Sequence, residues 1–460
     1  MTKAYSSLAI PNPADLIFGT APSPVTTRRG LVIGGGRVYP ELNFTLPAME
    51  LVEETWPQVR NHYERIAQGA LRRAAVLGAP GVVLECETLP PMTDRPGWAE
   101  EICRILLDHM EEARARTGLV SALRMTPNDN REMVRPPVMR SGPLWGRMEE
   151  TFERCAALGA DLLSIESVGG KEIHDEALTM CNIRHVVFAL CVMGARDMRF
   201  LWSRIAGIAA RHGVHAAGDT ACGFGNTAMV LAEQGMIPRT FAAVVRAITA
   251  VRSLAAYECG AVGPGKDCGY ENPILKAITG CPMAMEGKAA ACAHLSPVGN
   301  IAAASCDLWS NESVQHIRLL ADMAPTCSLE TLEYDCRLFN EAIKDGPGGA
   351  ATLQRWLVRS DAPLDPQAWV LTPENAVAVA EEIAASKSDY EAGRRAGLCA
   401  VKSLRAGMEA GLLKIPGREI PYLFMIQDEL ESLPECEESF ISACMDEVDR
   451  DKFIPSEYDL

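Results

Sequence analysis

Residues 162–170 read LLSIESVGG, an apolar run that reaches a glutamate, Glu166, and then two glycines. A short apolar run bounded by glycines is typical of a buried strand, and the glycines let the backbone approach a ligand closely. A carboxylate at the end of such a strand is costly unless it is paired with a cation or bound to a metal. Taken alone, the stretch is explained at least as simply by an ion pair between Glu166 and Lys171 or Arg199.

Two later stretches have the same form but carry a cysteine. Residues 216–226 read AAGDTACGFGN, in which Cys222 follows the apolar start and precedes a glycine. Residues 259–272 read CGAVGPGKDCGYEN, a glycine-rich loop in which Lys266 stands near Cys268 and would favour its thiolate form. A buried turn cysteine is an equally simple interpretation of a single such residue. A phosphate-binding loop is disfavoured, because the glycine spacing matches neither the P-loop nor the dinucleotide fingerprint.

The three stretches together predict one site. In a parallel barrel the carboxyl ends of the strands surround a single mouth, so ligands at equivalent positions of successive β–α units converge there. One carboxylate and two thiolates suit Zn²⁺, and three protein ligands leave a fourth position open, as in catalytic zinc sites. We therefore predict that Glu166, Cys222 and Cys268 bind Zn²⁺.

Short apolar segments alternate with longer helical ones along the first part of the chain. Eight segments have the composition of strands: Gly30–Gly34, Gly81–Glu87, Gly118–Met125, Asp161–Ser167, His185–Met193, Val214–Asp219, Arg252–Gly260 and Pro282–Lys288. Helical spacing of apolar residues marks Trp98–Arg116, Leu144–Leu158, Asp197–His212 and Thr227–Thr249. Eight strands alternating with helices predict an α/β fold, a (β/α)8 TIM-type barrel.

From about residue 296 the strand signal fades, and the remainder has the pattern of helices broken by proline and glycine. We therefore expect a barrel carrying the zinc site at residues 1–295 and a helical extension packed on it at residues 296–460. Residues 344–366 predict a loop or a boundary between lobes, and Thr372 is expected to cap a helix. The acid-rich end, Asp428–Leu460, predicts a solvated helix face, with the docking of a basic partner as the alternative.

Composition excludes several classes of partner. The chain has 44 Lys and Arg against 60 Asp and Glu, a formal net charge of −16, which disfavours nucleic acid and anionic membranes. No apolar run, including residues 185–195, reaches the roughly 18 residues of a membrane span. Sixteen cysteines without a secretory signal pattern predict a reducing compartment, and we expect a cytoplasmic protein.

Other motifs are weaker. Cys281, Cys292 and His294 lie close in sequence but lack the spacing of a zinc motif, and we expect them to pack or to support the site. No G-x-S-x-G elbow is present, which removes the simplest hydrolase interpretation. Sulfur-rich zinc activates water less well than a three-histidine site, so it suits the binding of a small oxygen- or sulfur-bearing substrate.

At these residues the chain resembles a known family, the zinc-containing methyltransferase subunit of the methanol:corrinoid methyltransferase system of methanogens and methylotrophic anaerobes. The similarity runs nearly end to end and is densest from Gly159 to Ser313. The blocks that carry it are Gly159–Ser167, Ala217–Thr220, Gly260–Asn272, Lys276–Gly280, Met285–Lys288 and Asp307–Ser313.

The resemblance implies a barrel enzyme whose zinc is held by one glutamate and two cysteines, which are Glu166, Cys222 and Cys268 in this sequence. It implies transfer of the methyl group of methanol to the Co(I) corrinoid of a partner protein, with zinc as the Lewis acid that holds the oxygen. Glu87, Asp219 and Lys266 are candidate catalytic residues that manage the proton, by their positions at strand ends; each fits a supporting role equally well.

The corrinoid is expected to come from a partner. Corrinoid proteins of this kind capture the cofactor with an Asp-x-His-x-x-Gly pattern, and none of the eight histidines here has aspartate two positions before it. We expect a homo-oligomer, or a hetero-oligomer with the corrinoid protein docked on the rim of the barrel. Two alternatives stay open: another O-methyl donor, such as a methoxylated aromatic, with the same fold and metal, and a non-catalytic subunit that holds a corrinoid protein.

Overall fold

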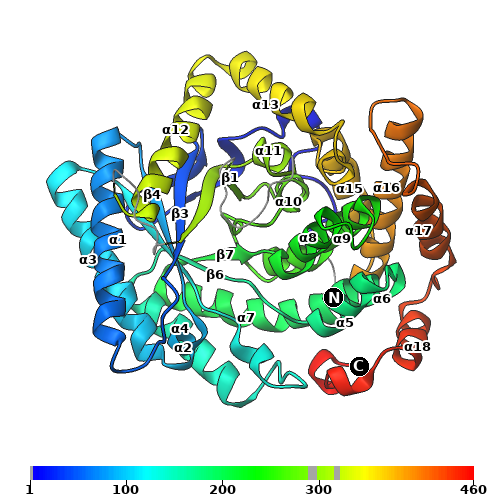
Figure 1. Ribbon diagram of the computed structural model, residues 1–460, viewed down its shortest axis with the longest axis horizontal. Helices are drawn as coiled ribbons and strands as arrows, with labels where there is room; N and C mark the ends of the chain where they lie inside the picture. Colours follow the sequence, from blue (N-terminus) through cyan, green and yellow to red (C-terminus); the bar gives the residue numbers. More distant parts are fainter. Residues whose placement is uncertain (1–3, 288–297, 315–321) are drawn as a thin grey trace.

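The centre of the molecule is a curled sheet of seven parallel strands, in the order β7-β6-β5-β4-β3-β9-β8 (Figure 1). The structure, a computed structural model, describes residues 4–287, 298–314 and 322–460. The strands are β3 (Tyr39–Thr45), β4 (Val82–Glu87), β5 (Ser121–Thr126), β6 (Leu162–Ile165), β7 (His215–Asp219), β8 (Ala284–Glu286) and β9 (Leu308–Val314). The chain is therefore an α/β protein built on a curled parallel sheet.

Helices link the strands and cover the outside of the sheet, because parallel pairing requires the chain to cross back between strands. Those linking the strands are α1 (Trp56–Leu77), α2 (Pro90–Asp94), α3 (Pro96–Thr117), α4 (Gly142–Leu158), α5 (Lys171–Thr179), α6 (Ile183–Val187), α7 (Ala195–His212), α8 (Thr227–Glu233), α9 (Arg239–Glu258), α10 (Asn272–Thr279) and α11 (Val298–Ala303). Those after β9 are α12 (Ala324–Lys344), α13 (Pro347–Asp361), α14 (Pro366–Trp369), α15 (Pro373–Ala384), α16 (Asp389–Glu409), α17 (Ile420–Ser432) and α18 (Glu437–Glu447).

Helices α3, α4 and α7 lie where the apolar spacing predicts them. Helix α3 ends where Gly118 adopts a left-handed conformation at φ 76°, in which its N–H returns to the carbonyl of Arg114. The loop predicted at residues 344–366 is wrong for most of its length, because α13 occupies it, and a boundary between lobes there stays a prediction. Thr372 caps α15 as predicted, accepting a hydrogen bond from the N–H of Asn375 at 3.4 Å.

Two of the eight predicted strands are helical. Residues 185–193 form the end of α6 and most of a π-helical segment, Phe188–Gly194, and Asn182 caps α6 by accepting a hydrogen bond from the N–H of His185 at 3.0 Å. The predicted strand Arg252–Gly260 instead belongs mainly to α9. In both cases the segment is buried on nearly all sides, so apolar residues occur without the period that distinguishes a helix from a strand.

The predicted strand Gly30–Gly34 is misplaced. It contributes to β2 (Val32–Gly35), which pairs with β1 (Thr20–Thr26) in a separate antiparallel hairpin. Leu31 and Ile33 pack against Val83 and Leu308 of the large sheet. The hairpin therefore covers one end of the sheet interior and does not extend the sheet.

Strands β3 and β9 were missing from the prediction, and they pair with each other in parallel over seven residue pairs from Tyr39↔Leu308 to Thr45↔Val314. Both alternate apolar residues with polar ones, including Glu41 and Ser310, so neither is a continuous apolar run. Because β9 belongs to the sheet, the expectation that residues 296–460 are wholly helical is wrong. The division into two domains remains a prediction, and its boundary lies outside the described residues.

The interior of the sheet changes from apolar to charged along the strands. Side chains on one face of a strand recur every second residue. On β4 the series runs from Val83, in a small apolar cluster, to Glu85 and then Glu87. On β5 it runs from Ala122 to Arg124, whose guanidinium donates to Glu41 on β3 at 2.6 Å. The carboxyl ends of the strands therefore surround a polar, charged interior.

Helix α9 lies between the sheet and an outer layer of helices. Figure 1 shows α15, α16 and α17 on the outer side of α8 and α9. By length and composition α9 is apolar enough to cross a membrane, but the whole of that apolar window is buried inside the protein. Such burial is typical of a core helix, and by itself the apolar window is weak evidence of a membrane span.

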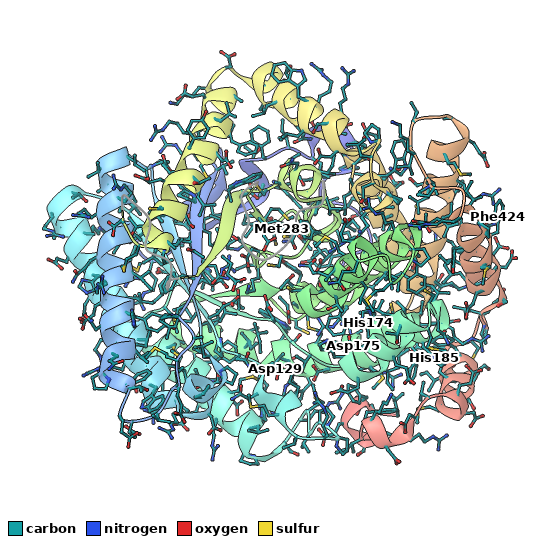
Figure 2. The ribbon with its side chains drawn as sticks, in the orientation of Figure 1. Asp129, His174, Asp175, His185, Met283 and Phe424 are labelled. Atoms are coloured by element: carbon teal, nitrogen blue, oxygen red, sulfur yellow. The ribbon has the colours of Figure 1, made fainter. Side chains whose placement is uncertain are left out.

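The acid-rich end of the chain is packed against the rest of the protein over part of its length. Glu447 of α18 contacts His185 at 3.1 Å, and His185 is labelled in Figure 2. The buried Tyr458 hydroxyl accepts a hydrogen bond from the N–H of Gly170 at 3.3 Å. By contrast, the side chain of Asp446 on α18 is 79% exposed. The predicted solvated face thus describes only part of this region.

Candidate metal centre

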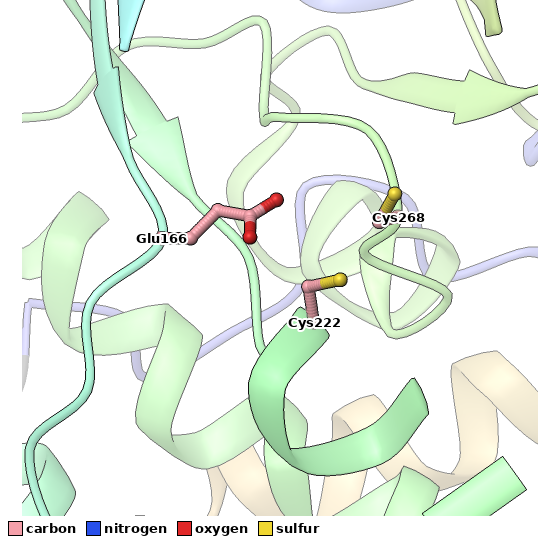
Figure 3. Close-up of side chains that lie close together, drawn as sticks. All are labelled: Glu166, Cys222 and Cys268. Carbon is pink, nitrogen blue, oxygen red and sulfur yellow. The ribbon is translucent and has the colours of Figure 1, made fainter. Parts of the chain in front are cut away.

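The structure brings the three predicted ligands together. Glu166 directly follows β6, Cys222 begins a π-helical turn (Cys222–Asn226) after β7, and Cys268 lies in the loop before α10. One ligand atom from each side chain lies within 4.8 Å of the others, and the three side chains converge in Figure 3. Residues up to about a hundred positions apart therefore form one constellation at the carboxyl ends of the strands.

The backbone around Cys268 is unusual. Cys268 has φ 57°, a left-handed conformation that non-glycine residues adopt rarely and at some cost in energy. A side chain at the next residue, Gly269, would place its Cβ 2.9 Å from Thr220 Oγ1 and 3.0 Å from Asn272 Oδ1. The loop is thus packed tightly against the strand end that precedes Cys222, which fixes the approach of the two cysteines.

Both thiols have polar partners. Asn226 Nδ2 donates to Cys222 Sγ at 3.4 Å and to the backbone carbonyl of Cys268 at 2.9 Å. Cys268 Sγ lies 2.6 Å from Glu286 Oε1, and the Tyr270 hydroxyl donates to the other oxygen of Glu286 at 2.9 Å. The hydrogen bond with Cys268 lowers the pKa of the Cys222 thiol, but burial and the charge of Glu166 outweigh it, so that pKa lies above its ordinary value.

Lys266 is the centre of an acidic cluster beside the three ligands. Its ammonium group, fully buried, lies 2.6 Å from Glu87, 2.9 Å from Glu166 and 2.8 Å from Asp267. A fourth carboxylate, Glu85, lies at 3.4 Å. Burial alone would lower the pKa of Lys266, but the attraction of these carboxylates outweighs burial and holds the pKa well above its ordinary value. The surrounding carboxylates therefore favour the charged form of Lys266.

Glu166 is paired with Lys266 and not with either cation considered from the sequence. Lys171 contacts Asp175 at 2.6 Å, and Arg199 contacts Asp389 at 2.7 Å. Burial raises the pKa of Glu166 to about 7 against the opposing attraction of Lys266, even though 37% of its side chain is exposed toward a pocket. Near neutral pH the carboxyl is therefore balanced between its protonated and ionised forms.

The predicted catalytic residues fall into two positions. Glu87 and Lys266 contact each other next to Glu166, and Asn43 donates to Glu87 at 3.0 Å. Asp219 is buried one layer behind: it accepts hydrogen bonds from the N–H and hydroxyl of Ser167 at 3.2 and 2.5 Å and from the indole of Trp202 at 3.1 Å. Asp219 thus holds the residue that follows Glu166.

A pocket of about 240 Å³ opens beside the constellation. Glu87, Glu166 and Gly223 line it on the side of the ligands, and Tyr63 and Leu89 supply apolar surface. Asp129, labelled in Figure 2, also borders it. A volume of this size accepts a small molecule next to Glu166 and the Cys222 turn.

The donor set fits zinc. Ligands of a tetrahedral zinc ion at 2.0–2.3 Å lie roughly 3.3–3.8 Å from one another. The three ligand atoms, within 4.8 Å of one another, need only small side-chain movements to reach such distances. Two other groups within the described residues combine suitable atoms, Asp267 with Cys268 and Glu286, and Glu85 with Glu87 and Asp267. Lys266 already contacts the second of these groups.

Of the remaining sequence candidates, Cys281 takes no part in the constellation. Cys281 is buried, and its backbone N–H donates to the Thr279 hydroxyl at 3.1 Å. Cys292 and His294 lie outside the described residues.

Several site residues were missed by sequence reasoning. Glu85 is two residues before Glu87 on β4, and this i, i+2 pair of glutamates in an apolar strand is a detectable signal of a charged interior. Asn226 and Glu286 gave no comparable signal, because an asparagine in a helical turn and a glutamate before a glycine are common. Their roles depend on contacts between segments far apart in the sequence.

The fold and the site define a parallel α/β protein with a candidate metal centre of one carboxylate and two thiols at the carboxyl ends of its strands. The chain belongs to the family described as methanol-cobalamin methyltransferase B subunit, whose family model matches residues 2–459.

Two relatives are similar over nearly the whole chain. The methanol–corrinoid protein co-methyltransferase of Methanosarcina barkeri (strain Fusaro / DSM 804) is 38% identical over 448 residues, which cover 96% of each chain. The crystal structure of the methanol:cobalamin methyltransferase complex MtaBC from Methanosarcina barkeri contains a chain that superposes with a TM-score of 0.94 at 36% identity, covering 100% of both chains.

Proposed function

We propose that this chain transfers the methyl group of methanol to the Co(I) corrinoid of a partner protein, at a Zn²⁺ ion bound by Glu166, Cys222 and Cys268. One observation carries the proposal: the three ligand atoms lie within 4.8 Å of one another beside a pocket of about 240 Å³. Membership of the family and the names of the two relatives support methanol and a corrinoid protein as the reaction partners.

We also propose that the sheet closes as the (β/α)8 barrel expected from the sequence. Residues 262–265 lie between β7 and β8 and bond to both. The N–H of Gly263 donates to the carbonyl of Ala217 at 2.8 Å, and the N–H of Ala284 donates to the carbonyl of Gly265 at 2.9 Å. This segment takes the eighth position of the barrel and delivers Cys268 to the mouth.

The chemistry requires a Lewis acid and a proton. Hydroxide is a poor leaving group, so zinc, when bound, supplies the positive charge that stabilises the departing oxygen. Cobalt attacks the methyl carbon with its electron pair, the C–O bond breaks, and the oxygen must gain a proton to leave as water. We assign that proton to the hydrogen-bonded pair of Glu87 and Lys266, with Glu87 at the pocket surface.

The other residues orient this machinery. Asp219 holds the Ser167 backbone and hydroxyl, and so fixes the direction from which Glu166 enters the site. Tyr63 and Leu89 cover the apolar side of the pocket and limit the water near the methyl group.

The test is anaerobic methylation of cob(I)alamin, followed by the loss of Co(I) absorbance, with methanol as donor and with protein that is zinc-loaded or zinc-stripped. We expect zinc-dependent loss of Co(I) with methanol. No reaction with methanol but reaction with a methoxylated aromatic would replace the donor. If zinc-loaded protein reacts with neither donor, even when its corrinoid protein partner is supplied, the catalytic assignment fails in favour of a non-catalytic binding subunit.

The cellular setting follows the same proposal. We propose a cytoplasmic location, because a chain with sixteen cysteines suits a reducing compartment. A homo-oligomer, or a hetero-oligomer with the corrinoid protein, remains our expectation for the assembly.

A further inference from the structure

Both cysteines of the proposed metal centre are held by one buried asparagine. Asn226 is 3% exposed and ends the π-helical turn that Cys222 begins. Its Nδ2 atom donates to Cys222 Sγ at 3.4 Å and to the carbonyl of Cys268 at 2.9 Å. One amide group therefore links two loops that are 46 residues apart in sequence, as counted from Cys222 to Cys268.

The orientation of this amide is set by an arginine. Arg246 Nη1 lies 2.8 Å from Asn226 Oδ1, and Arg246 Nη2 donates to the carbonyl of Gly225 at 3.0 Å. A guanidinium can only donate hydrogen bonds, so the oxygen of the amide must face Arg246. The NH₂ group must then face the sulfur of Cys222 and the carbonyl of Cys268.

The arginine is costly to bury. Arg246 is fully buried, and among the described residues no carboxylate lies within ion-pair distance of it. Its guanidinium instead lies over the ring of Tyr270 at 4.8 Å, and the Tyr270 hydroxyl donates to Glu286, which contacts Cys268 Sγ. Burying a guanidinium without an ion pair is unfavourable, because the charge loses its hydration. The contacts of Arg246 connect the surroundings of both thiols.

From this geometry we infer that Asn226, oriented by Arg246, is a positioning residue that sets the Cys222 and Cys268 ligands for the metal and withdraws electron density from the Cys222 sulfur. This inference rests on the proposed function. An N–H donor to a thiolate reduces the electron density that sulfur gives to zinc, so it keeps a sulfur-bound metal a stronger Lewis acid.

The experiment compares Asn226→Asp with the matched control Asn340→Asp, each in the full-length protein. Aspartate keeps the oxygen that faces Arg246 but has a second oxygen, which cannot donate a hydrogen bond, in place of the NH₂ group. Asn340 also links distant segments, since its amide bonds the N–H and carbonyl of Val38 at 2.9 Å, but it lies on α12 away from the thiols. Zn²⁺ affinity is measured by competition with a chromophoric chelator, and Co²⁺ replaces Zn²⁺ for absorbance spectra of the thiolate-to-cobalt bands.

We expect Asn226→Asp to bind Zn²⁺ about 10–100-fold more weakly, the usual effect of losing a group that orients a ligand. Its thiolate-to-cobalt bands should move to longer wavelength, because the sulfur loses a hydrogen bond and gains a negative neighbour. Asn340→Asp should match the wild type in both measurements. If Asn226→Asp has wild-type affinity and wild-type bands, the inference is wrong.

Two further measurements keep the outcomes distinct. If the buried charge prevents Asn226→Asp from folding, as judged by circular dichroism, Asn226→Ala carries the test with the same expected loss and the same direction of band shift. If Cys222→Ala and Cys268→Ala bind Zn²⁺ as tightly as the wild type, the two cysteines are not metal ligands. The metal site of the proposed function then fails, and the inference fails with it. If those two variants lose Zn²⁺ but the Asn226 variant keeps the wild-type affinity and bands, only the inference is overturned and the metal site stands.

Discussion

Replacing Lys266 by methionine should destabilise the metal-free protein strongly, and more so at high pH. The ammonium group lies within 3.4 Å of Glu85, Glu87, Glu166 and Asp267 and is fully buried. Methionine fills most of the same volume but leaves these carboxylates without their cation. Removing one partner of a buried ionic cluster typically costs about 3–5 kcal/mol.

That cost converts to a modest shift in melting temperature because the chain is long. At about 2.1 cal/mol/K per residue, unfolding of 460 residues has an entropy of about 1 kcal/mol/K, so the expected loss is about 3–5 °C. The loss depends on pH with a definite sign. Without Lys266 the carboxylates have higher folded-state pKa values, so stability is retained while they are protonated and is lost as pH rises through those values. The deficit should therefore shrink from pH 8 to pH 5.

The assay is thermal unfolding of metal-stripped protein by circular dichroism at several pH values. Lys452→Met is the matched control: Lys452 contacts Glu176 at 2.8 Å, but its side chain is 36% exposed, so removing it should cost less than about 1 kcal/mol. A Lys266→Met protein that melts within 1 °C of the control at every pH would refute the argument that this lysine balances the acidic cluster.

Three other outcomes are expected. Cys268→Ala should abolish zinc binding and methyl transfer while the far-ultraviolet circular dichroism stays unchanged. The control Cys306→Ala, at a buried cysteine away from the constellation, should keep its zinc. Equal metal content in the two variants would disprove the ligand assignment. The zinc affinity of the wild type should rise as pH increases through about 7, because Glu166 ionises there. Glu166→Gln should bind zinc more weakly and should lack this rise in affinity. A chelator titration at pH 6, 7 and 8 measures both effects. Asp219→Asn should retain zinc but lower kcat and shift the fluorescence of Trp202, whose indole donates to Asp219; unchanged emission and kcat would show that Asp219 positions nothing.

The sequence predicts the convergence of Glu166, Cys222 and Cys268 better than it predicts the strands. Glu166, Cys222 and Cys268 each lie where an apolar segment gives way to a glycine-rich one. This pattern is local, so it can be recognised without knowing the rest of the fold. The strands of the sheet do not all share that property. Where the interior is polar, as at Glu41 on β3 and Ser310 on β9, a core strand does not show a continuous apolar run.

The opposite error arises where burial is complete. Residues 185–193 and 252–258 are helical but show no polar face, because neighbouring helices cover them on the outside as well as the inside. Sequence periodicity reports one-sided exposure, and it fails when both sides are covered. The Asn226–Arg246 contact could not be predicted from the sequence either, because it depends on the position of α9. The sequence pattern predicts a helix for the first part of α9 and a strand for the last part.

The position of α9 has a consequence for dissecting the protein. Arg246 and Arg252 of this helix reach inward to the turns that carry Cys222 and Ser167, while its outer side packs under the C-terminal helices. A chain truncated near residue 295 would lose β9 from the sheet and would expose an apolar helix to water. We expect such a fragment to aggregate. The part of the chain that carries the proposed metal site should therefore not fold when it is expressed without the C-terminal helices.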